Sequence, residues 1–145
     1  MVKVSMRLGT LLLAVLWLAA CGTTAALFSQ TAYEQAVGIK VDALALMDKA
    51  VEPYSNHQAD VAELRHRMDA AYEYAKGRPK NGESTAQWAL LRDPNRNLLG
   101  GFLKRWEEKG RLSAVFINEA KKPITDALDS VIELESGKRK SGSNS

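Results

Sequence analysis

Cysteine and histidine are scarce in this 145-residue chain, which contains one cysteine, Cys21, and two histidines, His57 and His66. A single cysteine excludes an intramolecular disulfide, and it excludes the paired-cysteine motifs of structural zinc and of covalently attached haem. The two histidines are nine residues apart, so on one helix they would point about 180° away from each other. These absences predict a domain that folds on its apolar core, with no metal and no cofactor.

The sequence also lacks the common motifs of catalysis and of nucleotide binding. It contains no Gly-x-Ser-x-Gly, no His-Glu-x-x-His and no glycine-rich phosphate loop. Two pairs of carboxylates lie close together in the sequence, Glu107 with Glu108 and Glu133 with Glu135, and this spacing places the partners on different sides of a helix. We interpret them as solvated surface residues, and we predict no catalytic residue and no enzymatic activity.

Neither sign of charge dominates the chain. It has 20 Lys and Arg against 17 Asp and Glu, and without Lys3 and Arg7 the basic residues fall to 18. Acidic and basic residues alternate along most of the chain, except in the basic stretch 138–140 near the C-terminus. Such a balance is typical of an ordinary solvated surface, and it predicts no binding of nucleic acid.

The chain has no apolar run of the roughly 20 residues that a permanent membrane-spanning helix needs. Its longest apolar stretch, 8–20, is shorter, follows the basic residues Lys3 and Arg7, and ends in small residues. These are the three parts of an export signal peptide. Met6 followed by Arg7 begins a complete signal as well, so the sequence leaves the start of translation open between Met1 and Met6.

The end of this stretch, Leu18-Ala19-Ala20-Cys21, resembles the lipobox of bacterial lipoprotein precursors, Leu-(Ala/Ser)-(Gly/Ala)-Cys. The resemblance covers only the lipobox and the residues before it. It implies cleavage before Cys21, acylation of the Cys21 thiol and a membrane anchor made of lipid. Gly22 is not the aspartate that is associated with inner-membrane retention. We therefore expect the periplasmic face of the outer membrane, in preference to the inner membrane or a Gram-positive surface.

The rest of the chain favours an all-α fold, a bundle of about four helices. No segment shows sustained alternation of apolar and polar residues, whereas apolar residues recur every three or four positions. Helices are predicted over about 31–51, 57–76, 84–110 with a break at Asp93-Pro94, and 112–136. We expect an antiparallel up-down bundle, or else a less regular orthogonal helical domain.

The predicted organisation is a signal peptide at 1–20, a lipidated N-terminus and linker at 21–30, a helical domain at 31–136 and a disordered basic tail at 137–145. Three features within the helices predict local irregularity. Asp93-Pro94 is typical of a helix start, and Gly100-Gly101 indicates a kink or a close approach of another backbone. Pro123 is expected to kink or split the last helix, and Gly137 to end it.

Tyrosine and tryptophan residues suggest where a partner binds. Tyr72 and Tyr74 are two residues apart, about 200° around a helix, so both cannot face one core. We expect one of them to be exposed, and we place a candidate partner-binding surface at Tyr72, Tyr74 and Trp88, because aromatic residues are favoured at interfaces.

Together these observations predict a non-enzymatic, membrane-tethered lipoprotein whose helical domain binds another envelope protein. Pilotins and exclusion lipoproteins are similar in architecture only, and a pilotin-like role would require an apolar groove between helices. One alternative is a carrier of a small ligand or of haem, for which Met47, Met68 and the two histidines are candidate ligands. The other is an envelope hydrolase, which would need carboxylates that converge in a cleft.

Overall fold

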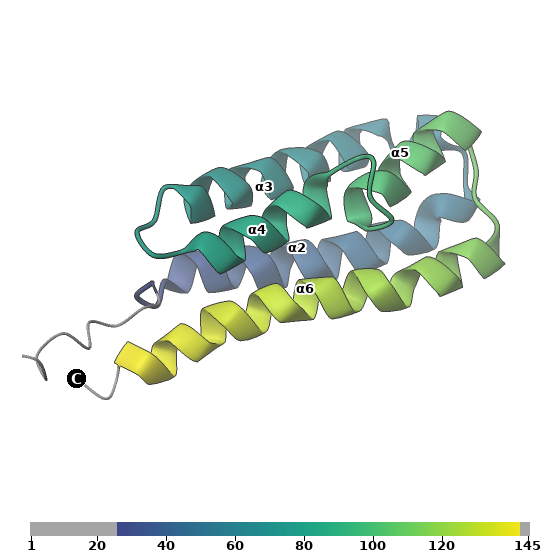
Figure 1. Ribbon diagram of the computed structural model, residues 1–145. Helices are drawn as coiled ribbons and strands as arrows, with labels where there is room; N and C mark the ends of the chain where they lie inside the picture. The colour runs from purple at the N-terminus through teal and green to yellow at the C-terminus, as the bar shows by residue number, and fades with distance from the viewer. Residues whose placement is uncertain (1–25, 143–145) are drawn as a thin grey trace, which may run out of the picture.

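The computed structural model describes residues 26–142, and these residues form an all-α four-helix bundle (Figure 1). The predicted fold class is therefore confirmed. Five α-helices make up the described part of the chain: α2 (Gln30–Asp48), α3 (Gln58–Lys76), α4 (Gly82–Arg92), α5 (Leu99–Lys109) and α6 (Ala114–Gly142). Two short 3₁₀ helices, η2 (Lys49–Val51) and η3 (Tyr54–Asn56), lie between α2 and α3.

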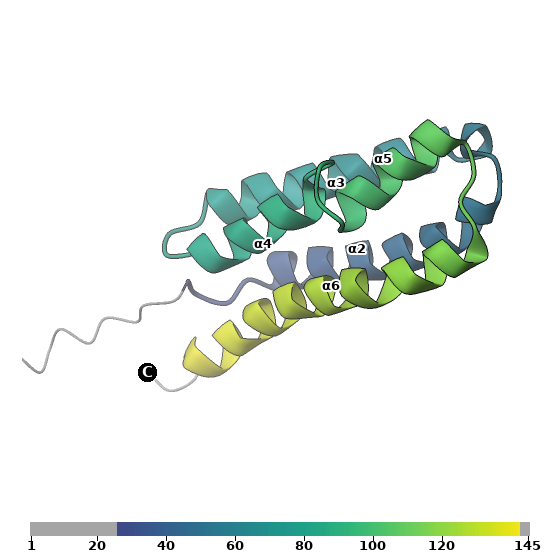
Figure 2. The ribbon, with the colours of Figure 1, turned by 45° about the vertical axis from the view of Figure 1, so that its right-hand side comes forward.

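The helices run alternately up and down, and α4 and α5 share the third position of the bundle. Helix α2 packs against α3 and α6, and α4 packs against the same two helices. Figures 1 and 2 show that α5 follows α4 in the same direction, before α6 returns along the whole bundle. As a result, the α3–α4 loop, the start of α2 and the end of α6 all lie at one end of the molecule.

The core forms because each helix buries one apolar face. The buried face of α2 consists of Ala32, Ala36, Ile39, Ala43, Leu46 and Met47, and Ala50 of η2 continues it. Tyr33, Val37, Val41 and Leu44 form a second stripe beside it, and Val41 is 61% exposed. The remaining helices contribute larger side chains, among them Leu64, Met68, Leu91, Leu103, Trp106, Ile124 and Leu128, all of them buried. Burial of apolar area on this scale is the main driving force for folding.

Salt bridges between neighbouring helices accompany the apolar core. Lys40 and Lys121 of the α2–α6 pair bind Asp129 and Asp48, and Arg67 of α3 binds Asp42 of α2. Exposed pairs of this kind contribute at most about 1 kcal/mol each. Here they pair opposite charges between neighbouring helices, and the pairs form only when the helices have this antiparallel arrangement.

The break between α4 and α5 differs from the sequence-based prediction. Asp93-Pro94 does not start a helix, because 93–98 forms turns and α5 begins at Leu99. The Asp93 carboxylate instead accepts a hydrogen bond from the Asn95 amide, at 2.9 Å. Aspartate commonly stabilises a turn through such a bond to the amide two residues later.

The glycine pair allows the close backbone approach that the sequence predicts. A Cβ atom at Gly100 would lie 2.4 Å from the Arg92 carbonyl oxygen, and one at Gly101 would lie 1.8 Å from the Arg96 carbonyl oxygen. Both distances are far shorter than atoms tolerate. Glycine is therefore required where the start of α5 packs on the loop that precedes it.

One prediction for the last helix is corrected and another is narrowed. Gly137 does not end α6, which continues to Gly142, and Pro123 lies inside α6, so the helix is not split there. The predicted disordered tail at 137–145 is therefore wrong for 137–142, and Lys138 is only 8% exposed. The helix extends this far because its last turns carry polar groups that the bundle binds.

Candidate functional site

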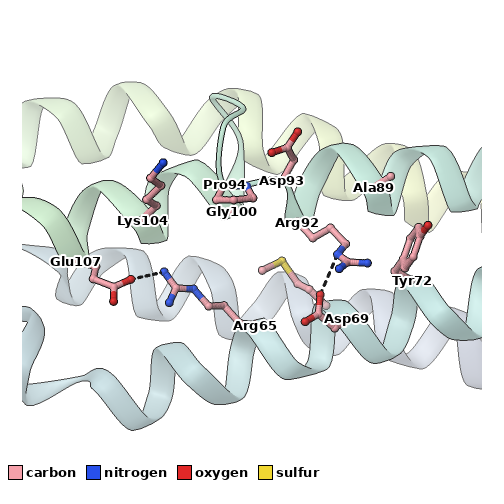
Figure 3. Close-up of a pocket in the computed structure, with 11 residues that line it drawn as sticks. Arg65, Asp69, Tyr72, Ala89, Arg92, Asp93, Pro94, Gly100, Lys104 and Glu107 are labelled. Carbon is pink, nitrogen blue, oxygen red and sulfur yellow. Dashed lines mark hydrogen bonds and ion pairs between the residues drawn. The ribbon is translucent and has the colours of Figure 1, made fainter.

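The break between α4 and α5 contributes to an open cleft on one long side of the bundle, here called the lateral cleft (Figure 3). It has a volume of about 650 Å³ and lies between α3 on one side and α4 and α5 on the other. Its small or apolar lining residues are Met68, Ala89, Pro94 and Gly100, and its polar lining residues are Arg65, Asp69, Tyr72, Arg92, Asp93, Lys104 and Glu107.

Paired charges surround this cleft. The Arg65 guanidinium donates to the Glu107 carboxylate at 2.8 Å, and the Arg92 Nε lies 2.9 Å from the Asp69 carboxylate. The Arg92 guanidinium also stacks over the ring of Tyr72, 4.4 Å from the ring centroid. Arginine lies flat on an aromatic ring in this way and still donates hydrogen bonds from its edge.

Ion pairs occupy the carboxylates of the lateral cleft that lie on α3 and α5. The carboxylates of Asp69 and Glu107 each pair with an arginine. The cleft offers donors, acceptors and an aromatic ring around a narrow apolar centre. The lining therefore carries charges of both signs and is not wholly apolar.

The structure separates the three aromatic residues predicted to form one surface. Tyr72 lines the lateral cleft, whereas Tyr74 is 38% exposed and hydrogen-bonds Ser29 near the start of α2. Trp88 is 3% exposed and belongs to the core, so its assignment to a partner-binding surface was wrong. Cys21 lies outside the described residues.

A second group of polar residues lies inside the end of the bundle that holds the start of α2 and the end of α6. Sequence reasoning missed this group. We call Glu135, Lys138, Arg78, Ser84 and Asn81 the anchor-end cluster. Glu135 is 1% exposed although it is a carboxylate. Its Oε1 accepts from the Ser84 hydroxyl at 2.6 Å and from Lys138 Nζ at 2.7 Å, and its Oε2 accepts from Arg78 at 3.1 Å.

The other members of the anchor-end cluster complete these bonds. Lys138 Nζ also donates to the Ser84 hydroxyl at 2.8 Å and to the Asn81 side-chain oxygen. The Asn81 amide group donates in turn to the Ala75 carbonyl at 2.9 Å. Among the described residues, every fully buried side-chain nitrogen or oxygen has a hydrogen-bond partner. The cluster therefore ties α6 to both ends of the α3–α4 loop.

Opposing effects act on the pKa of Glu135. Burial raises the pKa of this carboxyl, but hydrogen bonds from Lys138, Ser84 and Arg78 outweigh burial and hold the pKa below its ordinary value. A carboxylate that accepts several hydrogen bonds is stabilised in its charged form. At neutral pH Glu135 is therefore an anion that orders three donors around it.

A sequence signal for this cluster exists. Leu128, Val131, Glu135 and Lys138 follow one another at spacings of three, four and three, so Glu135 and Lys138 continue the buried stripe of α6. Ser84 likewise precedes Trp88 and Leu91 on the buried face of α4. Polar residues at core positions are the ones that require a buried partner.

Three of the four candidate haem ligands, His57, Met47 and Met68, are engaged elsewhere, and His66 is exposed on α3. The two ring nitrogens of His57 lie 2.7 Å from Glu52 and 3.4 Å from Asp60, and the ring packs against Trp106. Met47 and Met68 are packed in the core. Within the residues that the structure describes, no three histidine, cysteine or acidic side chains are grouped as metal ligands.

No helix among the described residues is long and apolar enough to span a bilayer.

Comparison with known proteins adds no relative. No protein-family model matches the chain, and neither a curated protein nor a solved structure is significantly similar to it.

Proposed function

We propose that this protein is a lipid-anchored, non-enzymatic protein of the bacterial envelope, whose helical domain binds another envelope protein. The observation that carries the proposal is the sequence Leu18-Ala19-Ala20-Cys21, which directly follows a basic and then an apolar segment. Acylation of Cys21 would hold the chain in one leaflet, since two or three acyl chains give effectively permanent anchoring. The proposed location is the periplasmic face of the outer membrane.

The lateral cleft is the proposed binding surface for the partner. It combines an aromatic ring, three cationic side chains and three carboxylates around an apolar centre, and arginine and tyrosine are enriched where proteins bind each other. The cleft lies on the side of the bundle, away from the end where the chain enters. A domain anchored by that end would keep the cleft accessible to a neighbouring protein.

Replacement of Cys21 tests the anchor. We expect Cys21→Ser to abolish incorporation of a labelled fatty acid and to leave a longer, uncleaved precursor, because serine offers no thiol for acylation. Labelling and gel mobility of the wild-type and variant chains measure both effects. Normal processing and normal labelling of Cys21→Ser would contradict the proposal.

Site-specific photo-crosslinking in intact cells tests the binding surface. A photoreactive residue at Lys104, in the lateral cleft, is compared with one at Lys122, which is 81% exposed on the outer side of α6. We expect a discrete crosslinked protein from position 104 and none of that mass from position 122. Identical products from both positions, or none from position 104, would contradict binding through the cleft.

A further inference from the structure

Three segments that are distant in the sequence form one end of the bundle, here called the anchor end: 26–29, 77–81 and 138–142. Figures 1 and 2 show all three at the same end. Arg78 hydrogen-bonds the Leu27 carbonyl, and Lys138 hydrogen-bonds the Asn81 side chain. The first segment is therefore bound to the second, and the second to the third.

The anchor end fixes the chain where it enters the bundle. Ala26 is 6% exposed, the Ser29 hydroxyl lies 2.9 Å from the Tyr74 hydroxyl, and Arg78 holds the Leu27 carbonyl. The predicted linker of 21–30 is thus part of the folded domain from Ala26 onward. Only residues 22–25, which lie outside the described range, separate that point from Cys21. At full extension the distance from Cys21 to Ala26 is about 17 Å.

The composition of the anchor end is one-sided. Its three segments contain five cationic residues, Arg78, Lys80, Lys138, Arg139 and Lys140, and no aspartate or glutamate. The neighbouring Glu135, buried against Arg78 and Lys138, offsets one of these positive charges. Leu27 is 75% exposed and is the most exposed large apolar side chain among the described residues. The nearby carboxylates Glu83 and Glu133 line a different hollow, on the sides of α4 and α6.

We propose that the anchor end docks on anionic phospholipid headgroups of the membrane that holds the acylated Cys21. This inference rests on the proposed lipid anchor. A headgroup layer is about 5–8 Å thick, so a reach of about 17 Å keeps the anchor end within about 10 Å of the surface. That distance is close to the Debye length at physiological salt. The net positive charge of these segments therefore lies where an anionic surface still attracts it.

Docking in this way orients the domain. Leu27 and the α3–α4 loop face the headgroups, and the helices stand away from the membrane. The lateral cleft then faces sideways, between the membrane surface and the distant end of the bundle. Without docking, the lipid anchor alone would not fix the tilt of the bundle relative to the membrane.

The test places a fluorescent label at each end of the acylated chain. Gly82→Cys labels the first residue of α4, next to the α3–α4 loop, where an added Cβ meets no atom within 4 Å. Val115→Cys labels the opposite end, at a residue that is 68% exposed. In the acylated chain the natural cysteine is blocked, so each variant carries one reactive thiol. The chains are reconstituted into vesicles that contain a quencher attached to the lipid headgroup.

We expect stronger quenching at position 82 than at position 115 in phosphatidylethanolamine vesicles that contain phosphatidylglycerol. In vesicles of phosphatidylcholine alone, quenching at position 82 should fall, because the surface is no longer anionic. Reversal of two charges by Lys80→Glu with Lys140→Glu should weaken docking at least about fivefold for each cation removed. The matched control, Lys49→Glu with Lys109→Glu on residues outside the anchor end, should change quenching little.

Two failures are distinguishable. If mass spectrometry finds the purified chain unacylated, the proposed function fails and docking fails with it. If the chain is acylated but quenching at position 82 is independent of lipid charge and of the Lys80 and Lys140 reversals, only docking is overturned. In that case the bundle is tethered without contacting the headgroups.

Discussion

The two ends of the bundle are closed by opposite chemistry. At the anchor end, a buried carboxylate and its cationic and hydroxyl partners join α6 to the α3–α4 loop. At the far end, a buried tryptophan and backbone hydrogen bonds join the α2–α3 connection to the α5–α6 connection. The same four-helix arrangement is therefore completed once with ions and once with an aromatic ring.

Trp106 is the centre of the far end. It is fully buried, and its indole nitrogen donates to the Glu52 carbonyl at 3.1 Å. The ring of Tyr54 meets it edge-on, with the centroids 5.7 Å apart. The two connections also bond directly, from the Tyr54 amide to the Gly110 carbonyl at 2.7 Å and from the Leu112 amide to the Ala50 carbonyl at 2.8 Å.

The two ends differ in how strictly they fix the positions of the elements that meet there. An apolar contact such as that of Trp106 tolerates small displacements, because burial has no preferred direction. A buried ionic cluster tolerates few, because any displacement leaves a charge without a partner. The anchor end thus fixes how α6 sits against the loop, at the same end of the bundle as residues 26–29. The following experiments test this division, from the largest expected effect to the smallest.

Removal of the tryptophan should have the largest effect. We expect Trp106→Ala to lower the free energy of unfolding by about 3–5 kcal/mol, because it empties a fully buried site. Chemical denaturation followed by circular dichroism measures the loss. Trp106→Phe is the control, since it keeps most of the packing and loses chiefly the bond to Glu52. A loss below about 1 kcal/mol for Trp106→Ala would show that the far end does not depend on this ring.

Neutralisation of the buried carboxylate should have the next largest effect. We expect Glu135→Gln to lower the free energy of unfolding by about 3 kcal/mol, because Lys138 and Arg78 lose their anionic partner inside the bundle. The matched control is Glu133→Gln, an exposed glutamate on the same helix, which should change stability by less than about 0.5 kcal/mol. Equal effects of the two substitutions would contradict the structural role of the anchor-end cluster.

Acid should remove part of the contribution that Glu135 makes. Its pKa in the folded state is lowered, so its carboxylate stabilises the fold above the unfolded-state pKa, and this contribution is lost as pH falls through the folded-state pKa. The stability difference between wild type and Glu135→Gln should therefore be constant near neutral pH and shrink in acid. Leu128→Ala, at a buried apolar site of the same helix, should cost the same at every pH. Denaturation curves at a series of pH values give both differences.

Loss of one hydroxyl at the anchor end should have the smallest effect. Tyr74→Phe removes the bond to Ser29 at a partly exposed site, and we expect a loss of about 0.5 kcal/mol or less. The local effect should be clearer, as faster hydrogen exchange at the start of α2 with unchanged exchange near Trp106. Uniformly faster exchange would show that Tyr74 supports the whole bundle rather than the entry of the chain.

The helices themselves could be predicted from the sequence, because their apolar residues recur at helical spacing. The stripe containing Leu99, Phe102 and Trp106 is buried as expected, and the predicted close approach at Gly100-Gly101 is confirmed. For α2, however, spacing alone did not show which of two adjacent stripes faces the core. That choice depends on how α3 and α6 pack around α2, which is a property of the whole bundle.

The features at the anchor end could not be predicted by reading residues one at a time. Gly137 is a common helix terminator, yet α6 continues because Lys138 has buried partners from the α3–α4 loop, which lies more than 50 residues away in the sequence. Glu135 was interpreted as a surface residue for the same reason. The partners of Glu135 and Lys138 can be identified only once α4 and α6 are known to lie side by side. The acylation of Cys21 stays a prediction.

The uninterrupted course of α6 has a consequence for changes in chain length. Its 29 residues extend about 44 Å, and each residue advances the helix by about 100°. One residue inserted between Pro123 and Glu135 would rotate Glu135 away from Ser84 and Arg78, while the preceding turns kept their places. Insertions in this helix are therefore expected to be far more harmful than substitutions on its outer side. The helix acts as a fixed spacer. Its length and rotational phase determine whether the contacts at both ends of the bundle can form together.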